Sequence, residues 1–249
     1  MTTVDAQVQQ LRDLIHGAQR IVFFGGAGVS TESGIPDFRS ESTQRRTFEQ
    51  FGLSPETILS ADFFDSHPDV FYRYVKEMLH RPDAEPGPAH LALAELEREG
   101  KLAAVVTQNI DGLHQRAGNT LVHELHGTLS SYHCTECGAP STGDEAMAQL
   151  DAGATVPTCS CGGTLKPDVV LYQEALPEEA LLGAAQAIAE ADLLIVAGTS
   201  LMVQPAASLV SLYEGRDLVL INKTPTPLDQ YATLVTNEPV GEVLAAAVA

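Results

Sequence analysis

The sequence predicts an α/β protein in which a parallel sheet carries helices on both faces and a smaller lobe is attached to it. Short apolar runs alternate along the chain with stretches at helical spacing, the pattern of strand–helix–strand units. The first apolar run stops at a glycine-rich turn, from Gly25 to Gly28. All four cysteines lie between Cys134 and Cys161, where the apolar periodicity weakens. The first two observations predict the sheet, and the third predicts the additional lobe.

Each predicted element rests on a local pattern of apolar residues. Apolar runs of four or five residues predict strands at 21–24, 102–106, 193–196 and 218–221, with a further strand or extended segment at 169–172. Residues 121–125 (LVHEL) predict another short strand. Helical spacing predicts helices at 8–15, 47–79, 89–99, 180–190, 205–213 and 240–248. Because most strands are separated by a helix, we expect the strands to run parallel.

The composition is that of a folded chain with a strongly acidic surface. Of 249 residues, 44% are hydrophobic and 19% are charged, which supports a sizeable core and excludes a disordered chain. The chain has 14 Lys and Arg against 33 Asp and Glu, a formal net charge of −19. Such a surface repels phosphate backbones, so we expect no nucleic-acid partner and favour a cationic one, such as a lysine-rich polypeptide.

The cellular compartment is predicted from what the sequence lacks. No apolar stretch approaches the length that spans a bilayer. Residues 1–10 are polar and show no basic-then-apolar signal peptide. We therefore expect a cytoplasmic protein without a membrane partner. In that compartment cysteines serve as metal ligands or thiols more often than as disulfides.

The turn after the first predicted strand contains Gly26, Ala27 and Gly28. Glycines at such a turn let the backbone approach a pyrophosphate, whose charge is favoured at a helix N-terminus. Two features of a dinucleotide fingerprint are missing, because Thr31 replaces the third glycine and no acidic residue ends a second strand about twenty residues later. A nucleotide-binding turn and a plain tight turn both remain open here, and an ordinary hydride-transfer dehydrogenase is disfavoured.

The cysteines form two close pairs, Cys134 with Cys137 and Cys159 with Cys161, each beside glycine. Two such pairs that meet across a loop can hold one zinc ion, and four thiolates leave no open position, so this zinc would be structural. The second pair has one intervening residue where two are usual, which tightens that turn. Scattered buried thiols and a nucleic-acid-binding zinc ribbon are the alternatives. The clustering argues against the first and the acidic charge against the second.

Polar side chains follow two of the predicted strands. Gln108, Asn109 and Asp111 come directly after the strand at 102–106. Ligands bind at the carboxyl ends of parallel strands, and buried amide and carboxylate groups need partners, either water or a bound polar molecule. His126 follows the next strand. A single histidine is more often structural than catalytic, but its place at a strand end favours a catalytic role.

Several blocks of the sequence together resemble the sirtuin family. They are residues 26–30 (GAGVS), 34–39 (GIPDFR), 107–111 (TQNID), 124–127 (ELHG), both cysteine pairs, 166–170 (KPDVV), 198–201 (GTSL) and 221–222 (IN). The blocks occur in the family's order and extend over nearly the whole chain. The resemblance implies a Rossmann-like NAD-binding domain at 1–39, 84–127 and 165–249. It further implies a small lobe at 40–83 and 128–164, composed of a helical module and a four-cysteine zinc module.

The resemblance also implies a function, NAD-dependent protein lysine deacetylation. The amide oxygen of acetyl-lysine attacks C1′ of the nicotinamide ribose, nicotinamide leaves, and His126 acts as general base on a ribose hydroxyl. An imidazole suits this task because its unperturbed pKa lies near neutral pH. The acetyl group ends on 2′-O-acetyl-ADP-ribose, so NAD is consumed as a co-substrate.

Individual residues receive roles through this resemblance alone. His126 and Asn109 match catalytic positions, and Val169 and Leu171 match the segment that pairs with the substrate backbone as an added strand. The NAD-binding positions are matched by Gly26, Ala27, Gly28, Thr31, Asp37, Phe38, Arg39, Gln108, Ile110, Asp111, His126, Gly198, Thr199, Ser200, Asn222 and Val240. The zinc ligands are matched by Cys134, Cys137, Cys159 and Cys161.

Within the NAD-binding set, Arg39 is expected to meet phosphate and Phe38 to shield the reacting carbon from water. Asp111 is expected to accept a hydrogen bond from the nicotinamide carboxamide. Each also has an ordinary alternative. Phe38 can be a core residue, Arg39 a solvated surface charge, and Asp37 or Asp111 a helix cap.

Two departures from the family pattern bear on the substrate. Residues 171–174 read LYQE where many members have FFGE, so Gln173 stands where glycine is usual and constrains the backbone beside the substrate channel. The family branch that favours succinyl or malonyl groups carries a Tyr-x-x-Arg pair, and residues 71–74 here read FYRY. The resemblance therefore predicts acetyl-lysine, or another uncharged acyl group, over succinyl-lysine.

Two other functions remain open at this point. Mono-ADP-ribosyl transfer to protein would use the same NAD pocket, and a non-catalytic module would only sense NAD. A sensor needs no general base, so His126 together with residues 108–111 argues against it. Nothing in the sequence suggests an obligate partner chain, and we expect a monomer.

Overall fold

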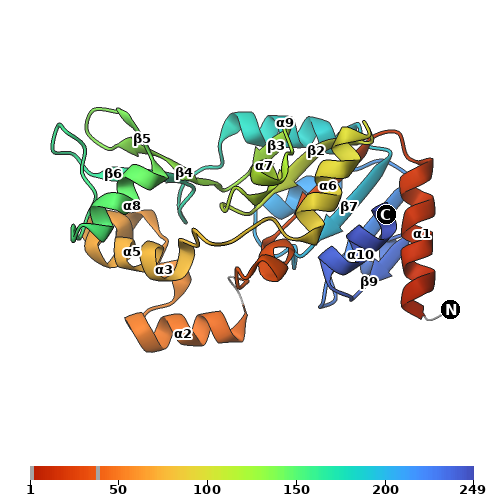
Figure 1. The fold of residues 1–249 in the computed structure, drawn as a ribbon, viewed down its shortest axis with the longest axis horizontal. Helices are drawn as coiled ribbons and strands as arrows, with labels where there is room; N and C mark the ends of the chain where they lie inside the picture. The colour runs from red at the N-terminus through yellow and green to blue at the C-terminus, as the bar shows by residue number, and fades with distance from the viewer. Residues whose placement is uncertain (1–2, 38–39) are drawn as a thin grey trace.

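The computed structural model describes residues 3–37 and 40–249, which form a six-stranded and a three-stranded sheet (Figure 1). The strands of the large sheet are β1 (Ile21–Gly25), β2 (Leu102–Thr107), β3 (Val122–Glu124), β7 (Leu193–Ala197), β8 (Asp217–Ile221) and β9 (Leu234–Thr236). They are all parallel and lie in the order β3-β2-β1-β7-β8-β9. This is the Rossmann order, in which ligands bind at the switch point between β1 and β7. The predicted Rossmann-like parallel sheet is confirmed.

Helices cover both faces of the large sheet. One face carries α1 (Thr3–Gly17), α6 (Pro88–Arg98) and α10 (Val240–Val248); the other carries α9 (Glu178–Ala189) and the 3₁₀ helix η3 (Ala206–Leu212). Ile21 and Phe23 of β1 pack into the first apolar layer, and Val22 and Phe24 pack into the second. Successive side chains of a strand point to opposite faces, so a strand between two helical layers must be apolar throughout. This explains the continuous apolar run from which β1 was predicted.

A smaller lobe lies at one end of the molecule, on the left in Figure 1. Its antiparallel sheet has the order β5-β4-β6 and consists of β4 (Gly127–Cys134), β5 (Pro140–Thr142) and β6 (Leu165–Val169). The helices of this lobe are α2 (Glu41–Phe51), α3 (Pro55–Ile58), α4 (Ala61–Ser66), α5 (Pro68–Tyr74), the π-helical turn η2 (Val75–Leu79) and α8 (Gly143–Asp151). Phe64, Tyr72, Tyr132 and Leu165 belong to one apolar core that joins α4, α5, η2 and α8 to the sheet.

The structure differs from the prediction in segments that lack a strong apolar period. The tract at 47–79 is not one helix, because Pro55 and Pro68 each begin a new one and proline is tolerated only in the first turn. Strands β4, β5, β6 and β9 and helix α8 were not predicted. In β6 only alternate residues are buried, namely Leu165, Pro167 and Val169, so the strand has no continuous apolar run.

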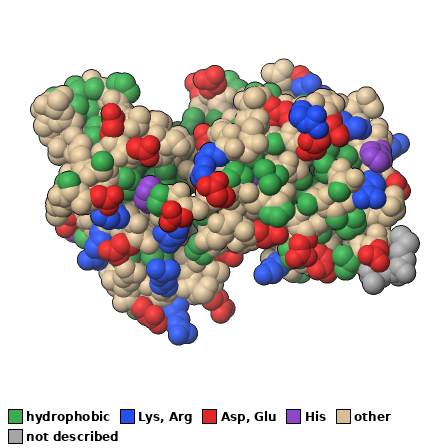
Figure 2. All heavy atoms as spheres, in the orientation of Figure 1, with side chains coloured by type: hydrophobic (Ala, Val, Ile, Leu, Met, Phe, Trp, Pro, Cys, Tyr) green, Lys and Arg blue, Asp and Glu red, His purple; other side chains and the backbone are tan. Residues whose placement is uncertain are grey.

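Three short helices complete the described chain: η1 (Ala27–Ser33), α7 (Leu113–Ala117) and η4 (Asp229–Tyr231). No helix in the part of the chain that the structure describes is long and apolar enough to cross a bilayer. Figure 2 shows acidic side chains spread over the visible face of both the large domain and the small lobe, in keeping with the net charge of −19.

Candidate functional site

The turns that follow β1 and β7 touch each other at the switch point of the large sheet. Gly26 N–H donates to Ala197 O at 3.1 Å, and Gly28 N–H donates to Gly198 O at 2.9 Å. Gly198 has φ +60°, and a Cβ at this position would lie 2.5 Å from Val29 N. Only glycine permits both the left-handed conformation and this close backbone approach. The glycine turn is therefore part of the strand-end crevice and not an isolated turn.

Gln108 joins the end of β2 to this pair of turns. Its N–H donates to Gly25 O at 2.9 Å, and its side-chain Nε2 lies 3.4 Å from Thr199 Oγ1. Thr199 is buried, and its hydroxyl oxygen also accepts a hydrogen bond from Leu201 N–H at 3.2 Å. Gln108 thus lies beside the turn that contains the predicted site residues Gly198 and Thr199, although Gln108 and Thr199 are 91 positions apart in the chain.

His126 lies half-buried directly after β3. Leu125 N–H donates to Thr107 O at 2.9 Å, which places the histidine beside the end of β2. His126 Nδ1 lies 2.9 Å from Gln108 O. A carbonyl oxygen can only accept, so Nδ1 carries the proton and the lone pair of the neutral ring is on Nε2. This tautomer can take up a proton through Nε2.

Asn109 and Asp111 are held in a buried hydrogen-bonded cluster around Ser30. Ser30 Oγ–H donates to Asp111 Oδ2 at 2.7 Å, and Asn109 Nδ2–H donates to Ser30 Oγ at 3.0 Å. Leu113 N–H donates to Asp111 Oδ1 at 3.0 Å, at the start of α7. Asp111 therefore accepts the first N–H of α7 from the residue before the N-cap Gly112, and it also belongs to the polar cluster at the strand ends.

His90 extends this cluster, and the sequence reasoning did not single it out. Its Nδ1 accepts Gly87 N–H at 3.1 Å, and its Nε2 lies 3.5 Å from Ser30 Oγ. Burial lowers the pKa of His90. The rings of His90 and His114 lie next to each other, with their centroids 4.7 Å apart. Burial lowers the pKa of His114 to about 3. The sequence signal was weak because His90 stands in an ordinary amphipathic helix, sixty residues from Ser30.

Other predicted NAD-binding residues form local contacts at the same edge. Thr31 is exposed, and its hydroxyl donates to Gly28 O at 2.9 Å. The Asp37 carboxylate accepts Ser40 N–H just before α2, where Ser40 itself is the N-cap and accepts Thr43 N–H. Phe38 and Arg39 lie outside the described residues, so their predicted roles are not addressed by the structure.

The remaining predicted residues are spread along the strand ends. Ala27 is the first residue of η1, and Ser200 follows Thr199 in the turn after β7. Asn222 follows β8, where its Nδ2 donates to Thr224 O at 2.7 Å. Val240 is buried in the large apolar core as the first residue of α10.

Residues 169–172 run from the crevice to the helical part of the small lobe. Val170 N–H donates to His126 O at 2.9 Å. Tyr172 N–H donates to Leu59 O at 2.9 Å, and Tyr172 O accepts Ala61 N–H at 3.1 Å. Ile110, on the crevice side, packs against the same apolar core as the buried side chains of Val169 and Leu171. The predicted substrate segment thus lies directly beside His126.

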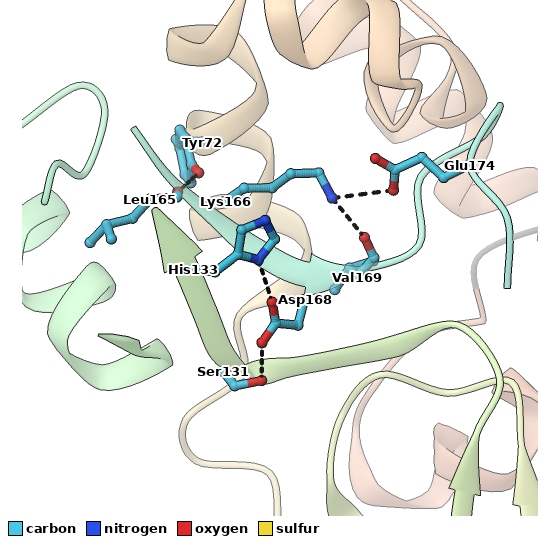
Figure 3. Close-up of polar contacts among 8 residues, drawn as sticks. All are labelled: Tyr72, Ser131, His133, Leu165, Lys166, Asp168, Val169 and Glu174. Atoms are coloured by element: carbon cyan, nitrogen blue, oxygen red, sulfur yellow. Dashed lines mark hydrogen bonds and ion pairs between the residues drawn. The ribbon is translucent and has the colours of Figure 1, made fainter. Parts of the chain in front are cut away.

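Polar side chains hold strand β6 in place next to this segment (Figure 3). Lys166 Nζ lies 3.2 Å from both Val169 O and Glu174 Oε2. On the neighbouring part of the strand, Asp168 Oδ1 lies 2.6 Å from His133 Nδ1 on β4. These contacts tie β6 to β4 on one side and to the following turn on the other.

The four cysteine Sγ atoms lie within 4.8 Å of one another. Cys134 and Cys161 are 3.4 Å apart, Cys137 and Cys159 are 3.8 Å apart, and none is in a disulfide. Zn–S bonds of about 2.3 Å place the thiolates of a tetrahedral site about 3.8 Å apart. The donor set and its spacing fit one structural zinc ion, as predicted. The single residue between Cys159 and Cys161 does not prevent the four Sγ atoms from coming together.

The fold and the site together define a class: a Rossmann-type α/β protein with a histidine at its switch-point crevice and a zinc-binding lobe beside it. A profile of the Sir2 family matches residues 26–205. The NAD-dependent protein deacetylase of Clostridium perfringens is 48% identical over 243 residues, which are 97% of this chain and 98% of that relative.

Two solved structures extend the comparison. A Sir2 protein with a p53 peptide and NAD+ has a TM-score of 0.85 and 39% identity over 95% of both chains. A Sir2 variant with a deacetylated p53 peptide and 3′-O-acetyl ADP-ribose has a TM-score of 0.88 and 38% identity over 96% of both chains. This chain belongs to the Sir2 family, the sirtuins.

Proposed function

We propose that this chain is an NAD-dependent protein lysine deacetylase with His126 as its general base. The observation that carries the role of His126 is the hydrogen bond from Nδ1 to Gln108 O, which leaves the lone pair on Nε2. A neutral imidazole with its lone pair on Nε2 is suited to act as a general base. The activity itself is supported by full-length similarity to a relative that carries this name.

The crevice offers different groups to the two ends of NAD. The touching turns at 26–28 and 198–200 lie where such sheets bind the pyrophosphate and the adenosine side. Because the N–H groups of Gly26, Gly28 and Gly198 are bonded within the fold, we assign these contacts to the N–H groups of Ala27, Thr199 and Ser200. Asp111 has both oxygens in hydrogen bonds, yet each carboxylate oxygen has a second lone pair that can accept the carboxamide N–H of nicotinamide. We assign Asn109 and Gln108 to the reacting ribose. Thr31, Asp37, Phe38, Arg39, Ile110, Asn222 and Val240 stay in the proposed NAD-binding set on the resemblance.

The reaction then follows from these positions. The acetyl-lysine oxygen attacks C1′ of the nicotinamide ribose, the C1′–N bond breaks, and nicotinamide leaves. His126 Nε2 takes the proton of a ribose hydroxyl, whose oxygen becomes bonded to the acetyl carbon. The bond between the acetyl carbon and the lysine nitrogen then breaks, and the protonated amine leaves. A water molecule adds to the acetyl carbon, and the bond from this carbon to the oxygen on C1′ breaks, which gives 2′-O-acetyl-ADP-ribose. The peptide is held as an added strand by the segment that contains Val169 and Leu171.

An uncharged acyl group fits the residues at 71–74. Tyr72 is fully buried, and its hydroxyl donates to Leu165 O (Figure 3). The Arg73 guanidinium lies 4.7 Å over the Phe51 ring. Neither side chain is placed to pair with the free carboxylate of a succinyl group. We therefore propose acetyl-lysine over succinyl-lysine as substrate.

The partner, compartment and domain limits are proposed in the same way. The partner is an acetyl-lysine-bearing protein, and the acidic surface favours lysine-rich surroundings. Localisation in the cytoplasm, a monomeric state, and domain limits at 1–39, 84–127 and 165–249 against 40–83 and 128–164 remain predictions.

Mass spectrometry of the products from NAD and an acetyl-lysine peptide tests the function. The expected products are nicotinamide, the deacetylated peptide and 2′-O-acetyl-ADP-ribose, with slower turnover of the matched succinyl peptide. Transfer of label from adenine-labelled NAD to protein would indicate an ADP-ribosyltransferase instead. Binding of NAD without release of nicotinamide would indicate a sensing module.

The variant His126→Ala tests the general base. We expect kcat to fall by about 10²- to 10⁴-fold, while the Kd for NAD stays within a few-fold, because only the proton acceptor is lost. His16→Ala, which removes an exposed histidine from α1, is the control. Near-normal turnover by the His126 variant would contradict the assigned role.

A further inference from the structure

Residues 171–174 form a tight turn directly after the segment proposed to bind the substrate backbone. Leu171 O accepts Glu174 N–H at 3.0 Å, and Glu174 Oε2 accepts Leu171 N–H at 2.8 Å. Gln173, the third residue of the turn, has φ +81°. Among the described residues other than glycine, only Leu201 shares a positive φ. The turn is therefore of type II, which favours glycine at its third position.

The side chain of Gln173 compensates for this backbone conformation. A glutamine at positive φ is less favourable than a glycine because its Cβ crowds the following carbonyl oxygen. Gln173 Oε1 accepts Asp62 N–H at 3.2 Å, and Gln173 Nε2 donates to Asp62 Oδ2 at 2.7 Å. Asp62 lies in the first turn of α4. Both hydrogen bonds therefore join the turn to the helical part of the small lobe.

Backbone hydrogen bonds link the position of this turn to that of the segment beside His126. On one side Val170 N–H is bonded to His126 O. On the other side Tyr172 is bonded through both N–H and C=O to Leu59 and Ala61, immediately before Asp62. The segment from 169 to 172 is thus hydrogen-bonded to His126 near one end and to Leu59 and Ala61 at the other. A shift of the turn relative to α4 would move Leu171, and with it the backbone that faces the substrate.

We propose that Gln173 and Asp62 form a positioning clasp that holds residues 169–171 in register for the acyl-lysine peptide beside His126. This inference rests on the proposed function. Neither residue touches the reacting atoms, and both act through the substrate segment. Loss of the clasp should therefore weaken peptide binding and leave NAD binding and the chemical step nearly unchanged.

The variant Asp62→Ala removes the carboxylate acceptor and leaves Gln173 in its unfavourable conformation. We expect the KM for the acetyl-lysine peptide to rise by about 3- to 10-fold, the effect of losing the one exposed hydrogen bond to the carboxylate. The bond from the backbone N–H of residue 62 to Gln173 Oε1 is retained. The kcat and the Kd for NAD should stay within about twofold, on the same reasoning. Asp62→Asn keeps an acceptor oxygen and should behave like the parent. Asp65→Ala, exposed on the same helix with the same charge change, is the matched control.

A second variant separates positioning from general damage to α4. In Asp62→Ala/Gln173→Gly the glycine takes φ +81° without crowding, so the peptide KM should return toward the parent value. An unchanged peptide KM in Asp62→Ala, a rise that Gln173→Gly does not reverse, or an equal rise in Asp65→Ala would each overturn the proposal. Direct binding of a fluorescent acetyl-lysine peptide in the absence of NAD reports on the clasp even if the proposed reaction is not observed.

Discussion

The large sheet and the small lobe are stabilised by different means. The large sheet has strands such as β1 and β7 that are buried at every position between two helical layers. The small lobe has a three-stranded sheet with one buried face, and its two cysteine pairs are brought together across the end of that sheet. The first region is therefore stabilised by two continuous apolar layers, whereas the second combines a smaller apolar core with a four-cysteine cluster that fits a structural zinc ion.

The two regions meet at the histidine proposed as general base. Strand β4 begins at Gly127, directly after His126, and Gly127 pairs with Val169 of β6. Gly127 has φ +72°, and a Cβ there would lie 1.8 Å from Asp168 O. Under the proposed function, the large sheet therefore contributes the NAD-binding residues, and the segment that joins it to the small lobe contributes the peptide-binding residues. Three variants test this division.

Removal of zinc should have the largest effect, and only on the small lobe. Structural zinc sites contribute apparent binding free energies of about 10–16 kcal/mol. We expect chelation or Cys137→Ser to abolish hydrogen-exchange protection at 128–164 while protection at 193–221 persists. Ser160→Ala, which lies between two ligands and removes neither, is the control. Simultaneous loss of protection in both regions would show that they unfold as one unit.

Gly198→Ala should disrupt the large sheet at its switch point. The left-handed φ and the 2.5 Å approach to Val29 N both oppose a side chain. We expect a loss of about 2–4 kcal/mol in the free energy of unfolding and weaker NAD binding. Gly52→Ala, with φ +70° and no atom within 4 Å, carries only the conformational cost of about 1 kcal/mol. Equal losses in the two variants, measured by urea unfolding, would contradict the importance of this close approach.

His114→Leu should produce the smallest change at pH 7, and its effect should appear in the pH dependence of stability. Burial lowers the pKa of His114 to about 3, and the unfolded chain titrates near 6.5. Between these values the unfolded state binds the extra proton, so stability falls as pH drops, by about 1.4 kcal/mol per pH unit for one such group. The variant also removes two buried ring nitrogens without partners.

We therefore expect His114→Leu to be as stable as the parent at pH 7 and to lose stability less steeply between pH 6 and 4. Urea unfolding at a series of pH values measures this. Parallel curves for the variant and the parent would show that His114 does not cause the acid sensitivity.

The accuracy of the sequence prediction follows the same division. Strands β1, β2, β7 and β8 were predicted because burial on both faces requires continuous apolar runs. Strands β4 and β6 were missed because neither is a continuous buried apolar run, and β5 was missed because it has only three residues. The crevice residues at 108–111 and His126 were predicted from their position after strands and from the resemblance. The partnership of Ser30 with His90 was not predicted, because no spacing rule connects a glycine turn to a helix sixty residues away.

The amino-acid sequence by itself determined the parallel sheet, the metal-binding character of the cysteines and the family, since each depends on local pattern, spacing or ordered motifs. The tertiary structure alone decided which nitrogen of His126 carries the proton, what surrounds Asp111, and how Gln173 occupies a position that favours glycine. These properties depend on hydrogen bonds between residues far apart in the chain, and such bonds exist only once the strand ends and the two lobes are packed together.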